Sequence, residues 1–430
     1  MQKKNLRVVV IGGGAAGFFG AIATAETHPH VSVTLLEAAR QPLNKVRISG
    51  GGRCNVTYAC FEPAILVQNY PRGGKALRGA FTRFQPRDTV AWFESRGIKL
   101  KTEKDGRIFP ITDNSETIVK GLLQAATQAG VEIRTNTPVV AVYSLGSHYP
   151  SFEIKLKSGE TLKCERLLLA TGSSLLGYRW AKELGHKIEP PVPSLFTFNI
   201  NDARLKDLAG ISVSNVRVRL PLAKLEQSGA VLITHWGLSG PAILKLSAWG
   251  ARFLHECRYK TPLLINWLPQ YNPEKLRELL LGVKSQLPRR AIASNCPLSI
   301  PRRLWERLVA AVGIEKEKRW AELSNKMLNR LIEELTQGKY EINGKGVFKE
   351  EFVTCGGVSL KEVDFKTMES RICPGLYFAG EILDIDGVTG GFNFQSAWTT
   401  AWLAAQAIGI NGGKASTALR NNKKTLAEQL

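Results

Sequence analysis

A glycine-rich segment near the N-terminus constrains the fold of this chain more than any other feature. Residues 7–11 read RVVVI, a β-branched run typical of a buried parallel strand, and Gly12-Gly13-Gly14-Ala15-Ala16-Gly17 follows at once. The pattern predicts a helix over 15–27 and a second strand over 31–37, which ends at Glu37. Gly-x-Gly-x-x-Gly in this context, with an acidic residue about 20 positions further on, indicates a dinucleotide-binding β-α-β unit.

The residues of this fingerprint have distinct expected roles. Gly12 allows a tight turn, Gly14 lets a pyrophosphate approach the backbone, and Gly17 lets the helix pack against the strand. The phosphates would lie at the helix N-terminus, where free N–H groups and the helix dipole favour anions. Glu37 would accept hydrogen bonds from a ribose diol and disfavour a 2′-phosphate.

The same stretch could be taken for a secretory signal peptide, because Lys3, Lys4 and Arg7 precede an apolar run over 8–25. The glycines inside the run and Glu37 favour the nucleotide-binding interpretation. Elsewhere no stretch reaches the roughly 18–20 apolar residues of a membrane span. The seven cysteines are scattered and form no Cys-x-x-Cys pair. We therefore expect a cytoplasmic protein with no membrane association, disulfide framework or metal site.

Two distant segments favour FAD over NAD as the resident dinucleotide. LLLATG over 167–172 and GLYFAGE over 375–381 read as buried strands that end in small residues. In flavoproteins with two dinucleotide folds, such strands return the chain to FAD, and the last one brings an acidic side chain to the cofactor. Residues 390–393 would begin a helix directed at the flavin, where the helix dipole stabilises negative charge. Ordinary strand ends of an α/β sheet are the alternative interpretation.

The middle of the chain has a different composition. Pro190, Pro191 and Pro193 mark a boundary, after which residues 194–268 alternate like strands and residues 273–338 have helical spacing. The fold class that we predict is α/β, with a Rossmann-like FAD/NAD(P)-binding domain of the two-dinucleotide-fold type. The strand-then-helix order predicts a β-rich subdomain at 191–270 and a helical subdomain at 271–346.

Further motifs resemble one flavoprotein family. ISGGGRCNVT over 48–57, GRIFP over 106–110, THWGLSGPAIL over 234–244 and PGLYFAGEILDIDGVTGGFN over 374–393 match segments of the BaiN/RdsA family of FAD-dependent oxidoreductases. That family includes a bile-acid ene-reductase and a ribosomal RNA dihydrouridine synthase. The resemblance implies a discontinuous FAD-binding domain, built from 1–190 and 347–430, with the β-rich and helical subdomains between its two parts. Non-covalent FAD is expected from the fingerprint, Glu37 and the turn at Gly380 and Glu381, with NADH or NADPH as a transient reductant.

The chain departs from the family after its ATG turn, where ATGSSLLGY reaches Gly177 and Tyr178 through a shortened loop. Since this loop is expected near the flavin, substrate access or specificity would differ. A lysine common before the family's glycine segment corresponds to Lys45 or Arg47. Arg53 is the best candidate to hold flavin or pyrophosphate charge, because a guanidinium forks onto anions.

The expected cofactor residues come from the fingerprint, the glycine segment and the returning strands. Glu381, Asp384 and Asp386 cluster near the flavin segment, and cofactor hydroxyls explain them more simply than a metal. The residues that we expect to bind FAD are Gly12, Gly14, Ala15, Ala16, Gly17, Glu37, Lys45, Arg47, Gly51, Gly52, Arg53, Cys54, Asn55, Val139, Thr171, Gly172, Gly380, Glu381, Asp384, Gly391, Phe392 and Asn393.

A reductase also needs a proton donor beside the flavin. The catalytic candidates are Cys355, Cys54 and His235, and Tyr178 is a further one. A thiol with an ordinary pKa of about 8.5 can donate to a carbanion-like centre. The alternative for each cysteine is a small buried hydrophobe, and for His235 a hydrogen-bonded structural histidine.

The chain is strongly basic, with 58 Lys and Arg against 37 Asp and Glu and a net charge of +21. The excess lies in residues 40–107, with 14 against 5, and in residues 190–345, with 24 against 13. This balance fits a polyanionic partner, although a solvated basic surface is the alternative. We expect ribosomal RNA, with phosphate contacts from Arg72, Lys75, Arg78, Arg83, Arg289, Arg290, Arg302 and Arg303. Trp236, Trp249, Trp267, Trp305 and Trp320 are available for base stacking.

Three functions follow from these observations. The favoured one is an NAD(P)H-driven, FAD-dependent reductase of an activated C=C bond, with uridine in ribosomal RNA as substrate. The second is a reductase or oxidase of a small apolar metabolite, as in bile-acid-type ene reduction. The third is a non-catalytic, flavin-containing RNA-binding protein. An open, glycine-lined face favours an enzyme.

Overall fold

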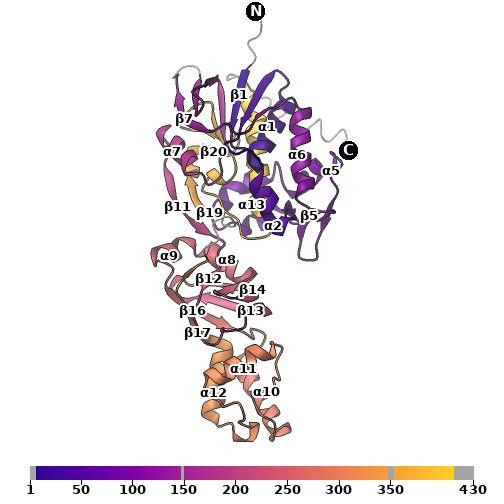
Figure 1. The fold of residues 1–430 in the computed structure, drawn as a ribbon, viewed down its shortest axis with the longest axis vertical. Coiled ribbons are helices and arrows are strands. Elements are labelled where there is room, and N and C mark those ends of the chain that lie inside the picture. Colours follow the sequence, from indigo (N-terminus) through magenta and orange to yellow (C-terminus); the bar gives the residue numbers. More distant parts are fainter. Residues whose placement is uncertain (1–5, 147–149, 347–352, 411–430) are drawn as a thin grey trace, which may run out of the picture. The chain divides into compact units, whose positions relative to one another are not determined.

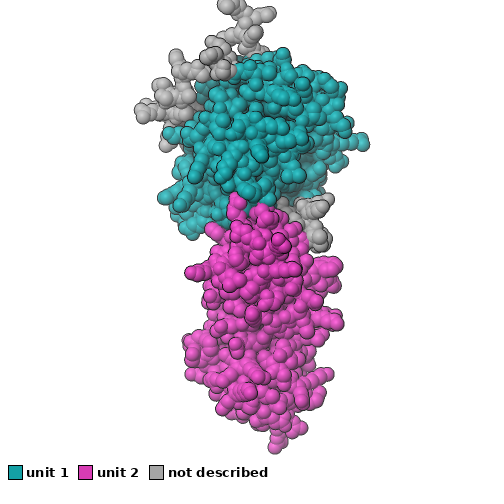
Figure 2. Space-filling view, turned by 90° about the vertical axis from the view of Figure 1, so that its left-hand side faces the viewer, with its two compact units in different colours: residues 1–191, 353–430 teal, residues 192–352 magenta. Residues whose placement is uncertain are grey.

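The chain forms two compact units. A computed structural model describes residues 6–146, 150–346 and 353–410. Unit 1 comprises Met1–Pro191 and Val353–Leu430, and unit 2 comprises Val192–Phe352. Unit 1 is therefore built from both ends of the chain, coloured teal in Figure 2 and indigo-to-magenta and yellow in Figure 1.

The centre of unit 1 is a seven-stranded sheet in the order β20-β21-β22-β10-β1-β2-β6. The strands from β22 to β6 run parallel, and β21 and β20 extend one edge in antiparallel fashion. Residues 8–11 of β1 are all buried, as expected for a parallel strand covered on both faces. The strands are β1 (Leu6–Ile11), β2 (Val31–Leu36), β6 (Glu132–Arg134), β10 (Arg166–Leu169), β20 (Val363–Asp364), β21 (Glu369–Ser370) and β22 (Leu376–Phe378).

Two apolar helices lie against this sheet and against each other: α1 (Ala15–Thr27) and α13 (Phe392–Ile408). The sequence of α13 has no charged residue, and most of its side chains are buried. The other helices of unit 1 are α2 (Asn44–Gly52), α3 (Pro63–Leu66), α4 (Gly74–Phe81), α5 (Pro86–Glu94), α6 (Glu116–Gln128) and α7 (Leu175–Glu183). Its 3₁₀ turns are η1 (Val67–Asn69), η4 (Leu360–Glu362) and η5 (Gly380–Ile382).

Three small sheets complete unit 1. One has the order β3-β5-β4, another β7-β8-β9, and the third pairs β11 with β19. The region 41–110 contains the short helices α2, α3 and α4 between its loops, and α4 buries Leu77, Ala80 and Phe81 on one face. These strands are β3 (Thr57–Tyr58), β4 (Leu100–Thr102), β5 (Arg107–Pro110), β7 (Val139–Ser144), β8 (Phe152–Leu156), β9 (Thr161–Cys164), β11 (Ile188–Ser194) and β19 (Val353–Val358).

Unit 2 contains a second seven-stranded sheet, in the order β17-β16-β13-β14-β15-β12-β18. Its strands are β12 (Phe198–Asn199), β13 (Ser212–Leu220), β14 (Leu225–Thr234), β15 (Gly237–Ser239), β16 (Thr261–Asn266), β17 (Gly338–Ile342) and β18 (Gly344–Lys345). Its helices are α8 (Pro241–Trp249), α9 (Ala251–Glu256), α10 (Pro273–Gln286), α11 (Arg302–Ala311) and α12 (Asn325–Gln337), with 3₁₀ turns η2 (Pro221–Ala223) and η3 (Trp320–Glu322).

A single apolar core joins the sheet and the helices of unit 2. Trp267, Trp305 and Trp320 are fully buried in it. The helices α8 and α9 lie within the segment predicted as strands, and β17 and β18 return from the helical segment to the sheet. The predicted subdomains at 191–270 and 271–346 therefore share one core. In the described ranges of the chain, no helix is both long and apolar enough to cross a membrane.

Candidate cofactor site

The turn between β1 and α1 requires two of its glycines for close packing. A Cβ added to Gly12, whose φ is +115°, would lie 2.4 Å from the Ala170 carbonyl oxygen. A Cβ added to Gly17 would lie 1.8 Å from the Gly12 carbonyl oxygen. Gly14 differs, because a Cβ there would meet no atom of the described residues within 4 Å. Open space therefore lies over the first turn of α1, which has no side-chain cap and no acidic residue.

Glu37 is fixed beside this turn by backbone hydrogen bonds. One carboxylate oxygen accepts from the Gly13 N–H and the other from the Ala39 N–H, both at 2.7 Å. The Glu37 carbonyl oxygen accepts from the Thr137 N–H at 2.8 Å, two residues before the buried Val139 at the start of β7. The structure thus brings Glu37 to the glycine turn and holds Val139 nearby through the backbone.

The carboxyl ends of β10 and β22 meet the start of α1. A Cβ added to Gly380 would lie 2.8 Å from the Cβ of Ala16, so η5 packs on the first turn of that helix. Glu381 follows, and its carboxylate accepts from the Thr354 N–H at 2.9 Å and pairs with Lys45 at 2.6 Å. The strand ends, the first turn of α1 and α2 therefore converge on one place.

The structure separates the two cations that precede the glycine segment. Lys45 Nζ lies between Glu381 and the Ser173 hydroxyl, which is 3.3 Å away, just after the β10 turn at Thr171 and Gly172. Arg47 instead pairs with Glu116 of α6 at 2.7 Å. Lys45 is therefore the one that reaches the converging strand ends.

The glycine segment leaves the helical conformation within α2. Gly51 and Gly52 have positive φ and are exposed, and a Cβ on either would meet no described atom within 4 Å. A Cβ on Gly391 would lie 2.9 Å from Oδ1 of the buried Asn55. The Thr57 hydroxyl donates to the Gln395 side chain at 2.6 Å. The glycine segment and the N-terminus of α13 are therefore adjacent, and Phe392 and Asn393 begin that helix.

Several buried polar atoms of this region have no hydrogen-bond partner within the described part of the chain. They are Asn55 Oδ1, Thr171 Oγ1 and the Tyr178 hydroxyl. Burying a polar group without a partner costs free energy, so such atoms point to polar groups that a ligand supplies. Together with the space over Gly14 and the Glu37 carboxylate, they fit a dinucleotide cofactor.

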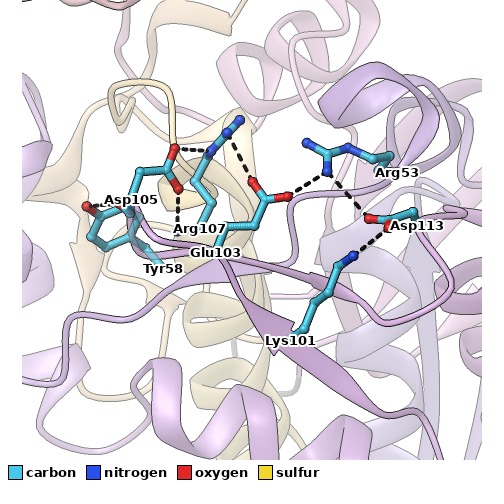
Figure 3. Close-up of polar contacts among 7 residues, drawn as sticks. All are labelled: Arg53, Tyr58, Lys101, Glu103, Asp105, Arg107 and Asp113. Atoms are coloured by element: carbon cyan, nitrogen blue, oxygen red, sulfur yellow. Dashed lines mark hydrogen bonds and ion pairs between the residues drawn. The ribbon is translucent and has the colours of Figure 1, made fainter.

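Arg53 does not present a free charge. Figure 3 shows its Nη1 directed at Glu103, 2.7 Å away, and at Asp113, 3.4 Å away. The guanidinium also stacks over the Phe109 ring, and hydrogen bonding to Glu103 raises the pKa of Arg53. Lys101 shares Asp113, and Arg107 pairs with Glu103 and Asp105 (Figure 3). Arg53 thus links the glycine segment to Glu103 in the β4–β5 hairpin and to Asp113, which follows β5. Neither carboxylate was predicted as a partner, although charges alternate along 101–107.

The proton-donor candidates differ in their surroundings. Cys54 and Cys355 are fully buried, and burial raises the pKa of the Cys54 thiol to about 12. Burial, and then the Glu381 and Asp384 carboxylates, raise the pKa of Tyr178. The Asp384 N–H donates to the Val358 carbonyl at 3.1 Å. His235 is exposed and lies between β14 and β15 in unit 2.

The cations predicted to contact nucleic acid also fall into two groups. The exposed ones are Lys75, Arg78, Arg289, Arg290, Arg302 and Arg303. Arg83 is partly buried and donates to the Lys366 carbonyl, and burial lowers its pKa. The expectation that Arg72 contacts a phosphate is wrong, because its guanidinium binds the buried Asp386 carboxylate.

Comparison with known protein families identifies the family of this chain. The family model described as HI0933-like protein Rossmann domain matches residues 6–407. The chain belongs to this family. Its members are FAD-dependent oxidoreductases, so the predictions of a Rossmann-like FAD-binding fold, of FAD as cofactor and of an enzyme are confirmed. The non-catalytic alternative is thereby set aside.

Two relatives within the family match over nearly their full length. The ribosomal RNA dihydrouridine synthase of Escherichia coli (strain K12) is 31% identical, covering 93% of this chain and 96% of the relative. The 3-dehydro-bile acid delta(4,6)-reductase of Clostridium scindens is 28% identical, covering 93% and 98%. Among solved structures, a 3-ketosteroid-delta4-(5alpha)-dehydrogenase from Rhodococcus jostii RHA1 has a TM-score of 0.51 at 12% identity, covering 96% of this chain and 98% of that one, which supports the fold.

Proposed function

We propose that this enzyme is an NAD(P)H-driven reductase that converts uridine in ribosomal RNA to dihydrouridine in the cytoplasm. The family assignment supports a FAD-dependent oxidoreductase, and two relatives of similar identity act on very different molecules. The observation that carries the choice between them is charge. A small apolar metabolite gains nothing from a net charge of +21, whereas a polyanion does.

We assign the cofactor to the converging elements of unit 1. The pyrophosphate would lie at the N-terminus of α1 over Gly14, with the adenosine ribose at Glu37. The flavin would lie beside Gly51, Gly52 and the N-terminus of α13. FAD held there would supply hydride transfer between the nicotinamide and the substrate. The backbone openings and unpartnered polar atoms of this region support the assignment.

We propose Tyr178 as the proton donor. Its hydroxyl is buried and has no hydrogen-bond partner among the described residues, and like any phenol it is protonated at neutral pH. The Cys54 thiol, in contrast, already hydrogen-bonds with Ser49. Tyr178 also lies in the first turns of α7, shortly after the shortened loop that follows Gly172. Its O–H can therefore supply the proton that a reduced C=C bond requires beside the hydride.

The exposed cations of unit 2 support RNA binding. Arg289, Arg290, Arg302 and Arg303 are exposed, in a segment with 24 Lys and Arg against 13 Asp and Glu. Arg302 also pairs with Glu306 on the helix surface and Arg303 donates to the Asp207 carbonyl, so a phosphate would share or replace these contacts. Of the five tryptophans considered for stacking, three are fully buried, while Trp236 is 62% exposed. We propose that the arginines bind phosphates and that Trp236 stacks on a base.

The second candidate, reduction of a small apolar metabolite, is supported by the bile-acid relative. A direct competition separates the two. Purified enzyme with NADH or NADPH would be offered either ribosomal RNA or an unsaturated 3-keto steroid. We expect dihydrouridine in the RNA by mass spectrometry and no steroid product. Reduction of the steroid alone would favour the second candidate.

A further inference from the structure

The Arg72–Asp386 pair lies in the interior of unit 1, beside the segment that leads into α13. The Asp386 side chain is completely buried, and both of its carboxylate oxygens accept hydrogen bonds from the Arg72 guanidinium. The Arg72 side chain is only 14% exposed. Because a buried carboxylate is stable as an anion only beside a compensating charge, the two side chains depend on each other.

The chain around Arg72 holds the segment 385–392 at further points. Arg72 and Asp386 form an antiparallel β-bridge through their backbones. The Val388 N–H donates to the Asn69 carbonyl at 2.8 Å, and the Tyr70 hydroxyl donates to the Phe392 carbonyl at 2.7 Å. Residues 69–72 therefore act as a template along which this segment lies.

The segment needs such a template because it is rich in glycine. Gly390 and Gly391 have φ of +137° and +91°, and glycines lose much conformational freedom when they are fixed. A Cβ on Gly391 would lie 2.8 Å from the Thr57 carbonyl oxygen, so the path of the chain here is narrow. The direction in which α13 begins is set by these few residues.

We propose that Arg72 and Asp386 are positioning residues for FAD: they hold segment 385–392 so that the N-terminus of α13 is directed at the flavin. The inference rests on the cofactor placement proposed above and not on the choice of substrate. A helix N-terminus stabilises nearby negative charge, including that of a reduced flavin. Loosening the segment would weaken FAD binding and make the flavin harder to reduce.

The test uses purified holoenzyme carrying Arg72→Ala, with Arg78→Ala on the exposed face of the adjacent α4 as the matched control. Release of FAD after dilution is followed by flavin fluorescence, and the midpoint potential of the bound flavin by dye-coupled titration. We expect Arg72→Ala and Asp386→Asn each to release FAD at least about tenfold faster and to lower the potential. Arg78→Ala should match the wild type in both measurements.

The double variant Arg72→Met/Asp386→Leu distinguishes a role in protein stability alone from a role in positioning FAD. Replacing a buried ion pair with apolar side chains often preserves stability. We expect thermal unfolding close to that of the wild type, but FAD release still faster and the potential still lowered. Wild-type release and potential in this folded variant would overturn the proposal. If the double variant does not fold, Arg72→Lys, which keeps the charge but not the fork, decides by the same criteria.

A mistaken cofactor placement would give a different pattern. Gly14→Leu should abolish FAD retention if the pyrophosphate lies over α1, whatever Arg72 does. Retention of FAD by Gly14→Leu would refute the placement. Loss of FAD from Gly14→Leu, combined with wild-type behaviour of the Arg72 variants, would refute the positioning role alone.

Discussion

Arg53 and Arg72 of unit 1 and Arg289 and Arg290 of unit 2 occupy opposite environments, although all four lie in segments with an excess of basic residues. Arg53 and Arg72 of unit 1 lie in glycine-rich, basic stretches, yet each binds carboxylates of its own chain. Arg289 and Arg290 of unit 2 are exposed to solvent. A basic stretch therefore does not define a basic surface, because Arg53 and Arg72 are held by carboxylates of unit 1 whereas Arg289 and Arg290 are exposed.

The largest effect is expected from Gly14→Leu. Its Cβ meets open space, so the fold should be kept, but the side chain would occupy the place proposed for the pyrophosphate. We expect complete loss of flavin absorbance in a protein with normal circular dichroism. The matched control is Gly17→Ala, where the added Cβ would collide with the Gly12 carbonyl, so a lower unfolding temperature is expected. Retention of flavin by the Gly14→Leu protein would contradict the proposed position of the pyrophosphate.

The next effect is expected from Tyr178→Phe, which removes only the proposed proton donor. Turnover should fall by about 10²–10⁴-fold, the usual contribution of general acid catalysis. FAD occupancy and reduction of the flavin by the nicotinamide should stay normal. Stopped-flow measurement of the two half-reactions checks this. An effect confined to flavin reduction would mean that Tyr178 serves the cofactor rather than the substrate.

A quadruple variant tests whether the exposed arginines of unit 2 bind RNA. It replaces Arg289, Arg290, Arg302 and Arg303 with Gln. If each binds one phosphate, the log–log salt slope of RNA affinity should decrease by about 3, since each contact contributes roughly 0.7–0.9. Bound FAD should be unchanged. A filter-binding series over salt concentration measures the slope. Equal, salt-insensitive retention of RNA by both proteins would remove the reason for preferring an RNA substrate.

The smallest effect is expected from Arg53→Ala, compared with Arg78→Ala. Loss of the contacts to Glu103, Asp113 and Phe109 frees the glycine segment, so FAD affinity should fall by about tenfold. Arg78 is exposed on α4, and its replacement should leave FAD affinity unchanged. Titration of flavin fluorescence measures both. Equal, small effects would mean that Arg53 does not organise the segment.

Local features of the site could be predicted from the sequence because the physics there is local. The turn at Gly12, the opening at Gly14 and the acidic end of the second strand follow from the spacing within a single β-α-β unit. The family motifs also pointed correctly to a FAD-dependent enzyme. The contact between Lys45 and Glu381, in contrast, could not be predicted from the sequence, because these residues are 336 positions apart.

Long-range pairings could not be read from the sequence. Arg72 has the composition of a phosphate contact, and Asp386 that of a cofactor ligand, but they bind each other across 314 positions. In the same way, the burial of Trp267, Trp305 and Trp320 depends on the core that sheet and helices of unit 2 share. In these cases residue type indicated the kind of interaction, such as an ion pair or an aromatic contact. Tertiary packing determined which residues form it.

Mapping of dihydrouridine in ribosomal RNA would show directly whether ribosomal RNA is the substrate of this enzyme. The RNA would be compared between cells with the gene, cells without it, and deletion cells that carry either the wild type or Gly14→Leu. We expect a dihydrouridine to be lost on deletion, restored by the wild type and not restored by the Gly14→Leu variant. An unchanged dihydrouridine pattern in the deletion would contradict the proposed substrate.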